Sequence, residues 1–129
     1  MSKTKYKNPV SPHAKRRIRE RYKHECKDDY ELSRNALHFG IHAGQLPYES
    51  ELRGYLLSKM CTKNKIVRML NGYVYIFSRS RRLITMYPVP EAFMLEANSL
   101  TDLQEKNRLQ YKQWKENNRM QKSVKHSTI

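Results

Sequence analysis

The spacing of apolar residues changes near residue 65. Up to that point apolar residues recur every three or four positions, as they do on one face of a helix. This first part predicts three helices, at residues 12–24, 28–39 and 49–60. Ser11 followed by Pro12 is a typical helix start, and Gly40 is a typical stop for the second helix. In the third helix we expect the buried residues to be Leu52, Leu56 and Met60.

The following segment predicts a small antiparallel sheet. β-branched and aromatic residues dominate three short runs, at 66–70, 73–77 and 83–87, and Pro88 and Pro90 end the last of them. Asn71 and Gly72 separate the first two runs and are the preferred pair for a two-residue type I′ turn. We therefore expect a hairpin joined to a third strand.

The two-residue turn fixes the register of the hairpin and gives its two faces different characters. One face would carry Val67, Met69, Val74 and Ile76, and helices would cover it. The other would carry Arg68, Leu70, Tyr73 and Tyr75, a mixed aromatic and cationic surface. If Phe77 pairs with Leu83, then the third strand places Thr85 beside Tyr75 and Arg68.

These elements predict an α+β fold, with N-terminal helices packed on one face of the sheet and a helix at the C-terminus. The expected organisation is a flexible basic arm at 1–10, an α+β domain at 11–92 and a C-terminal helix with a basic tail at 93–129. Ser99 and Asp102 have the spacing of a capping box for a helix over about 99–122. This helix has few apolar residues, so we expect it to be mostly solvated and loosely docked.

The charge of the chain indicates a polyanionic partner. There are 26 Lys and Arg residues against 12 Asp and Glu residues, a formal net charge of +14. The first 24 residues hold nine basic residues against Glu20 alone, and residues 59–82 hold seven basic residues and no acid, while 25–58 is net acidic. Such segregation favours nucleic acid as the partner. No apolar run approaches the roughly 18 residues of a membrane span, so we expect an intracellular protein of a bacterial host's cytoplasm that does not bind membranes.

The cysteines do not indicate a metal site. Cys26 and Cys61 lie far apart, and two reduced thiols are the simplest interpretation. A zinc site that adds His38 and His42 is an alternative, but it lacks the paired cysteine spacing of zinc-binding motifs. No phosphate-binding glycine loop and no carboxylate cluster for magnesium occurs in the sequence. We therefore expect no metal and no cofactor.

The first predicted helix carries the residue types needed for RNA cleavage without metal. Helical spacing aligns His13, Arg17, Glu20 and Arg21 on one stripe. The reaction needs a base for the 2′-hydroxyl, an acid for the leaving oxygen and a cation for the phosphorane. Histidine can move either proton, and arginine matches phosphate oxygens. The alternative is a basic helix that only binds phosphates.

Further residues are candidates for nucleic-acid contact. They are Lys15, Arg16, Arg68, Tyr73, Tyr75, Arg79, Arg81 and Arg82. The arginines of the loop before the third strand would contact phosphates. Tyr73 and Tyr75 would stack bases if their strand is open, although packing within the core is an equal alternative.

Three parts of the sequence together resemble a known group. They are the spacing of His13, Arg17 and Arg21, the step from Phe39 to Ile41, and the strands at 74–77 and 83–90. Over residues 10–92 they resemble small phage and Firmicutes proteins related to the barnase–EndoU–colicin–RelE superfamily of metal-independent ribonucleases.

This resemblance implies a RelE-like antiparallel sheet that cups RNA, with catalytic residues on the first helix and the sheet. Carried over to this chain, the catalytic set is His13, Arg17, Arg21 and Thr85. The arginine-rich loop at 79–82 and the C-terminal helix depart from the pattern, which leaves the substrate specificity open.

The sequence thus favours an RNA endonuclease of phage or toxin type that cleaves by 2′-hydroxyl attack. Its partner would be RNA, with an antitoxin or a host protein as a second partner. The alternative is a non-catalytic phage protein that binds nucleic acid or a host ribonucleoprotein, such as an RNA-guided nuclease, and inhibits it as an anti-CRISPR protein does. A DNA-binding regulator ranks last, because the helix at 28–39 starts with acidic residues.

Overall fold

The computed structural model of the chain describes residues 9–22, 29–60 and 64–127, with side chains described as far as 119. Its elements in chain order are α1 (Pro12–Tyr22), α2 (Asp29–Phe39), a 3₁₀ turn η3 (Ala43–Gln45), α3 (Glu51–Met60), β1 (Ile66–Leu70), β2 (Tyr73–Phe77), β3 (Leu83–Pro88), α4 (Glu91–Asn98) and α5 (Thr101–Ser127). The three strands form one antiparallel sheet in the order β1-β2-β3. The predicted α+β class and C-terminal helix are confirmed.

The hairpin between β1 and β2 has the predicted register, and β3 departs from it. Asn71 and Gly72 have φ angles of 54° and 82°, as a type I′ turn requires. Phe77 pairs with Leu83 as expected, but an irregularity between Ile76 and Phe77 shifts the rest of β3 by one residue. Thr85 therefore pairs with Ile76, and the prediction that it lies beside Tyr75 and Arg68 is wrong.

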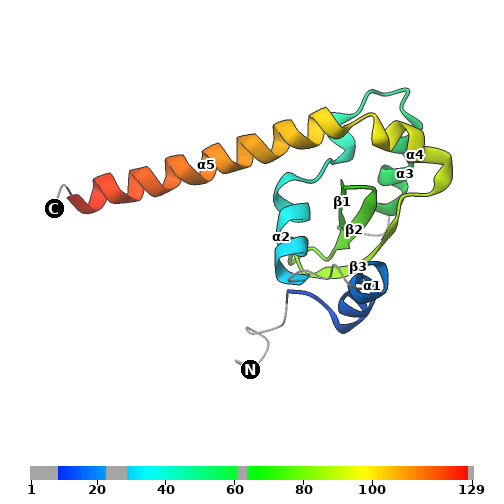
Figure 1. The fold of residues 1–129 in the computed structure, drawn as a ribbon, viewed down its shortest axis with the longest axis horizontal. Helices are drawn as coiled ribbons and strands as arrows, with labels where there is room; N and C mark the ends of the chain where they lie inside the picture. The colour runs from blue at the N-terminus through cyan, green and yellow to red at the C-terminus, as the bar shows by residue number, and fades with distance from the viewer. Residues whose placement is uncertain (1–8, 23–28, 61–63, 128–129) are drawn as a thin grey trace.

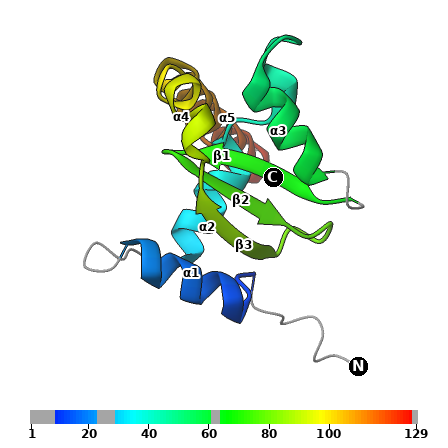
Figure 2. The same cartoon turned by 90° about the vertical axis from the view of Figure 1, so that its right-hand side faces the viewer.

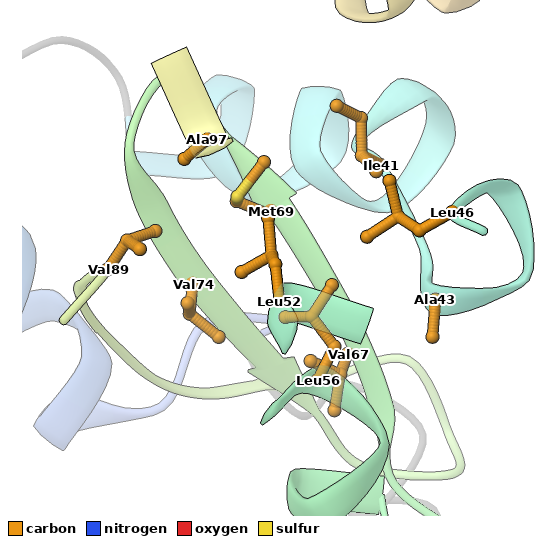
Figure 3. Close-up of a cluster of buried hydrophobic side chains, with 10 residues drawn as sticks. All are labelled: Ile41, Ala43, Leu46, Leu52, Leu56, Val67, Met69, Val74, Val89 and Ala97. Atoms are coloured by element: carbon orange, nitrogen blue, oxygen red, sulfur yellow. The ribbon is translucent and has the colours of Figure 1, made fainter. Parts of the chain in front are cut away.

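Helices cover both faces of the sheet, not one face as predicted. Figure 1 shows α2 on one side of the sheet and α3 with α4 on the other. Figure 3 shows Val67, Met69 and Val74 from the strands facing Leu52 and Leu56 of α3 in the first buried cluster. The second cluster contains Val10, Ala14, Ile18, Ala36, Leu70, Tyr75, Phe77, Leu83 and Met86. Each strand therefore presents apolar residues on both faces.

The second cluster corrects two predictions from the sequence. Val10, placed in the flexible arm, is fully buried and forms a parallel bridge with Leu83, while 1–8 lie outside the described residues. Tyr75, placed on an open aromatic face, is only 1% exposed.

In α3, Leu52 and Leu56 are buried as predicted, but Met60, the last residue of the helix, is 37% exposed.

The short helix α4 was not predicted, although Pro90 before an acidic first turn is a typical helix start. Glu96 of α4 accepts hydrogen bonds from the Ser50 hydroxyl and, at 3.1 Å, from the Leu52 N–H, so it binds the first turn of α3. Ser99 does not begin the last helix as a capping box would. It ends α4, and its hydroxyl donates to the Glu96 carbonyl at 2.6 Å.

The sequence predicted a loosely docked C-terminal helix, but hydrogen bonds between side-chain amides hold the first half of α5 against the body. Asn107 is buried and exchanges two hydrogen bonds with Gln45, at 2.9 and 3.0 Å. The Gln104 side chain accepts a hydrogen bond from the Asn71 N–H at 2.9 Å and so binds α5 to the hairpin turn. Ala97 of α4 belongs to the first core cluster, so the C-terminal segment shares the core of the domain before it. The second half of α5 extends away from the body (Figure 1).

None of the described helices is both long enough and apolar enough to cross a membrane.

Two glycines should respond oppositely to alanine. A Cβ at Gly40 would lie 2.5 Å from the Ala36 carbonyl oxygen and 2.9 Å from the Arg68 Cβ, so Gly40→Ala should cost about 1–3 kcal/mol of unfolding free energy. Gly54 lies inside α3 with nothing within 4 Å of the added atom. Gly54→Ala should therefore stabilise by about 0.5–1 kcal/mol. Urea unfolding of both variants measures the pair, and a destabilised Gly54→Ala would contradict this account of α3.

Candidate active site

The N-terminus of α1 is bound to β3 through Ser11. The Ser11 N–H donates to the Leu83 carbonyl at 2.9 Å, and the Leu83 N–H donates to the Pro9 carbonyl at 2.7 Å. The Ser11 hydroxyl donates to the Ile84 carbonyl at 2.9 Å and accepts from the Ala14 N–H at 3.1 Å. Ser11 is thus the predicted helix cap and also a link to the strand. These hydrogen bonds fix the position of the first turn of α1 along β3.

This link brings His13 to Thr85. His13 Nε2 and Thr85 Oγ1 lie 3.2 Å apart and share a hydrogen bond whose donor depends on the imidazole tautomer. The two residues are 72 positions apart in the chain. His13 is exposed and Thr85 is half-buried, so the pair lies where solvent or a substrate can reach it. The structure therefore places two of the four predicted catalytic residues in contact.

Arg17 and Arg21 follow His13 on the same stripe of α1. The helical rise puts them about 6 Å and about 12 Å further along the axis. Arg17 forms an exposed ion pair with Glu20, at 3.4 Å, and both side chains stay accessible. Arg21 is partly buried, and its Nε makes no hydrogen bond within the described residues. Helical side chains lean toward the N-terminus, so Arg17 is the cation placed to reach a group held at His13.

The local field at His13 is positive. The first turn of α1 has no acidic residue, so the positive end of the helix macrodipole favours an anion there. Lys15, two residues after His13, lies on the other side of the helix, where its ammonium is 6.0 Å from the ring centre of Tyr30. Arg16, three residues after His13, lies on the neighbouring face. Arg16 is exposed. These two residues remain predicted nucleic-acid contacts beside the His13 site.

Reasoning from the sequence missed a group on β3 next to Thr85. Tyr87 lies two residues beyond Thr85 on the same face of the strand, which is a distance of about 7 Å. Burial, with the neighbouring hydroxyl of Tyr55, raises the pKa of Tyr87 well above its usual value, so its phenol stays neutral. The Lys59 ammonium lies 5.7 Å from the Tyr87 ring centre and 5.2 Å from that of Tyr55. Lys59 in the last turn of α3 had no motif that could have identified it.

Of the two tyrosines predicted to stack bases, Tyr75 is not accessible, whereas Tyr73 keeps part of its surface exposed. Tyr75 is buried under α1 and α2, and Tyr73 is partly buried against the same cluster. Arg79 is exposed and Arg82 is partly buried in the loop between β2 and β3. In this loop the Ser78 N–H donates to the Arg82 carbonyl at 2.8 Å. The loop is therefore ordered by its own hydrogen bonds.

Arg68 lies on β1, at the opposite edge of the sheet from β3 and Thr85, as the strand order in Figure 2 shows. With Arg81 of the loop before β3, whose charge acts on it, Arg68 forms a second cationic region. Partial burial, and secondarily the charge of Arg81, lowers the pKa of Arg68. Burial and then Arg81, Arg34 and Lys115 lower the pKa of His38. Burial and then Arg68 lower the pKa of His42. Arg68, His38 and His42 line a hollow of about 410 Å³ between the end of α2, β1 and α5.

Among the described residues no group of three or more His, Cys, Asp and Glu side chains has the arrangement of a metal site. Cys26 and Cys61, which the zinc alternative requires, lie outside the described residues. The residues around His13 are cations and hydroxyls, which suit an anion and not a metal ion.

Comparison with known proteins adds no relative: no family model, no curated protein and no solved structure matches this chain.

Removal of the Ser11 hydroxyl should destabilise the fold. Ser11→Ala loses the cap of α1 and the bond to the Ile84 carbonyl together, so the unfolding free energy should fall by about 1–2 kcal/mol. Ser58→Ala is the matched control, because the Ser58 hydroxyl bonds only within its own helix, to the Tyr55 carbonyl. Its effect should stay within about 0.5 kcal/mol. Equal effects in urea unfolding would argue against the link between α1 and β3.

The lowered pKa of His38 should make stability depend on pH. Below its ordinary pKa of 6.5 the unfolded chain binds a proton that the folded chain binds only at lower pH. Stability should therefore be lost as the pH falls through 6.5 and level off below the folded pKa. In His38→Gln, urea unfolding from about pH 8 to about pH 5 should show a shallower decline than in the native chain. Parallel curves would contradict the prediction.

Proposed function

We propose that the protein is a metal-independent RNA endonuclease that cleaves by attack of a 2′-hydroxyl on the adjacent phosphate. The observation that carries the proposal is the contact between His13 on α1 and Thr85 on β3. A histidine that can move a proton and a hydroxyl that can bind a phosphate oxygen meet at the positive end of a basic helix. The motif resemblance to the barnase–EndoU–colicin–RelE superfamily points to the same residues.

In this mechanism His13 takes the proton of the 2′-hydroxyl. The 2′-oxygen then bonds to phosphorus and the bond from phosphorus to the 5′-oxygen breaks. The 5′-oxygen leaves with the proton that His13 took from the 2′-hydroxyl, which gives a 2′,3′-cyclic phosphate and a free 5′-hydroxyl. Thr85 donates a hydrogen bond to a non-bridging oxygen. Arg17 stabilises the added negative charge of the phosphorane.

Glu20 lies about 10 Å from His13 along the axis. It forms an ion pair with Arg17 as a carboxylate, so it orients Arg17 and has no proton to donate to the leaving oxygen. Arg21, about 12 Å from His13 along the axis, is assigned to the next phosphate of the chain and not to the scissile one. Lys59 supplies a further cation from the α3 side. RNA would thus run along α1 and the outer edge of β3.

One observation favours a second candidate function, a binder that inhibits a ribonucleoprotein without cleavage. The second half of α5 extends from the body (Figure 1) and begins with the basic residues Lys115 and Arg119, so it is a basic arm of the kind that docks on nucleic acid or its complexes.

Cleavage of a labelled single-stranded RNA in the presence of EDTA tests the proposal. The native protein should yield products ending in 2′,3′-cyclic phosphate, and His13→Ala should lower the rate about 10²–10⁴-fold. Thr85→Val should lower it about tenfold or more, the loss of one hydrogen bond to a charged group. Thr101→Val, an exposed threonine at the start of α5, should cleave at the native rate.

Tight binding without cleavage, with equal affinity in His13→Ala, would contradict the ribonuclease and favour the inhibitor. A single-stranded DNA of the same sequence should bind and remain intact, because it lacks the attacking 2′-hydroxyl.

A further inference from the structure

Three aromatic rings form a stack beside the second cationic region. The imidazole of His38 and the ring of Tyr111 lie 4.6 Å apart and nearly parallel, with an interplanar angle of 8°. The Trp114 ring follows at 5.9 Å from Tyr111, with an angle of 20°. Trp114 is 56% exposed, so the stack ends in an open aromatic face. Packing does not explain an exposed tryptophan, which is usually half-covered or more.

Trp114 lies in the walls of two adjacent hollows. The first, of about 410 Å³, reaches from Trp114 to Arg68 and His42 at the edge of the sheet. The second, of about 330 Å³, is lined by Trp114, Lys115, Asn118 and Arg119. Each is within the size range of sites that hold small organic ligands. The first hollow has no acidic residue in its lining, although three positive or protonatable groups border it.

Arg68 lines the first hollow, and Arg81 lies outside its lining but acts on Arg68 by its charge. Neither arginine forms an ion pair with an acidic residue among the described residues. Arg68 is partly buried, and its one side-chain hydrogen bond goes to the Val67 carbonyl, at 3.0 Å. Arg81 has a φ of 71°, a conformation that costs a residue with a side chain about 1–2 kcal/mol. Hydrogen bonds of the loop hold it there, including one from the Arg81 N–H to the Ser78 carbonyl at 2.9 Å. The repulsion between the two guanidinium groups is what a bound anion would relieve.

We infer that this region is a second RNA site, which binds one unpaired nucleotide with its phosphate on Arg68 and Arg81 and its base stacked on Trp114. The inference rests on the proposed function for the identity of RNA as the ligand. Cations next to an open aromatic face are the combination that binds single strands, because every base has a π face and every link has a charge. A duplex would not fit, since its bases already stack on one another.

This site lies away from the His13 site, at β1 and α2 in place of β3 and α1. It would hold the RNA at a distance from the scissile bond and would affect affinity without affecting the chemical step. An enzyme with one site of each kind selects substrates with an unpaired segment near the cleavage position.

Binding of a fluorescently labelled 2′-O-methyl uridine decamer tests the inference, because this RNA lacks the attacking hydroxyl and stays intact. Fluorescence polarisation measures the affinity, and Trp114, the one tryptophan of the chain, reports stacking by its own emission. Arg81→Gln and Trp114→Ala should each weaken binding about tenfold. Both positions are exposed, so neither change threatens the fold.

The salt dependence separates the two contributions. Arg81→Gln should reduce the slope of log affinity against log salt by about 0.7, because it removes one phosphate contact, and Trp114→Ala should leave the slope unchanged. The matched controls are Arg53→Gln and Tyr48→Ala. The Arg53 guanidinium lies 4.5 Å from the exposed Tyr48 ring, a cation–aromatic pair of the same kind on another surface. These controls should bind within about twofold of the native chain.

Native affinity in Arg81→Gln and Trp114→Ala would overturn the inference, and so would unquenched Trp114 emission in the saturated complex. Uridine monophosphate that quenches Trp114 as tightly as the decamer would replace RNA by a free nucleotide. Polyglutamate that competes as well as RNA would replace it by an acidic protein. The decamer binds independently of His13, so a failure of this inference leaves the cleavage assay untouched, and a failure of cleavage leaves the binding assay untouched.

Discussion

Ser11 bonds to the strand β3 through its backbone and its hydroxyl, and the same hydroxyl caps α1. The arrangement of the candidate active site depends on this one residue. A helix packed on a sheet by apolar contacts alone can slide or rotate, because such contacts have little directionality. Hydrogen bonds to two successive carbonyls remove that freedom at the first turn of α1. His13 is two residues after Ser11, so these hydrogen bonds also determine its position relative to Thr85.

The sheet could be predicted in its pairing but not in its burial. The Asn71-Gly72 turn determines the register of β1 and β2, because a two-residue turn admits one pairing. The shift between Ile76 and Phe77 has no such local signal, and it reassigns the neighbours of Thr85. Arg68 on β1 and Tyr75 on β2 alternate with apolar residues, which is the pattern of strands with one solvent-exposed face. The helices α1 and α2 cover that face nevertheless, and only their packing decides it.

The candidate site was accessible from the sequence as far as it lies on one helix. The stripe of His13, Arg17 and Arg21 follows from helical geometry alone. Thr85 was named as a catalytic residue only because of a motif resemblance, and the structure places its side chain in contact with His13. Lys59 and Tyr87 could not be found, because α3 and β3 meet only in the folded chain. The second cationic region has the same origin, since α2, β1, the loop before β3 and α5 all contribute to it.

The long helix α5 is held at one end only. Its first half is bonded to Gln45 and Asn71, and its C-terminal end extends away from the body (Figure 1). An isolated helix of about a dozen residues is marginal in water, and Lys115 and Arg119 place like charges one turn apart. The extent of helix in this segment is therefore a function of ionic strength. Counterions that screen this repulsion favour the helix, and a polyanion laid along the segment would favour it more strongly, so this end of α5 would gain order on binding one.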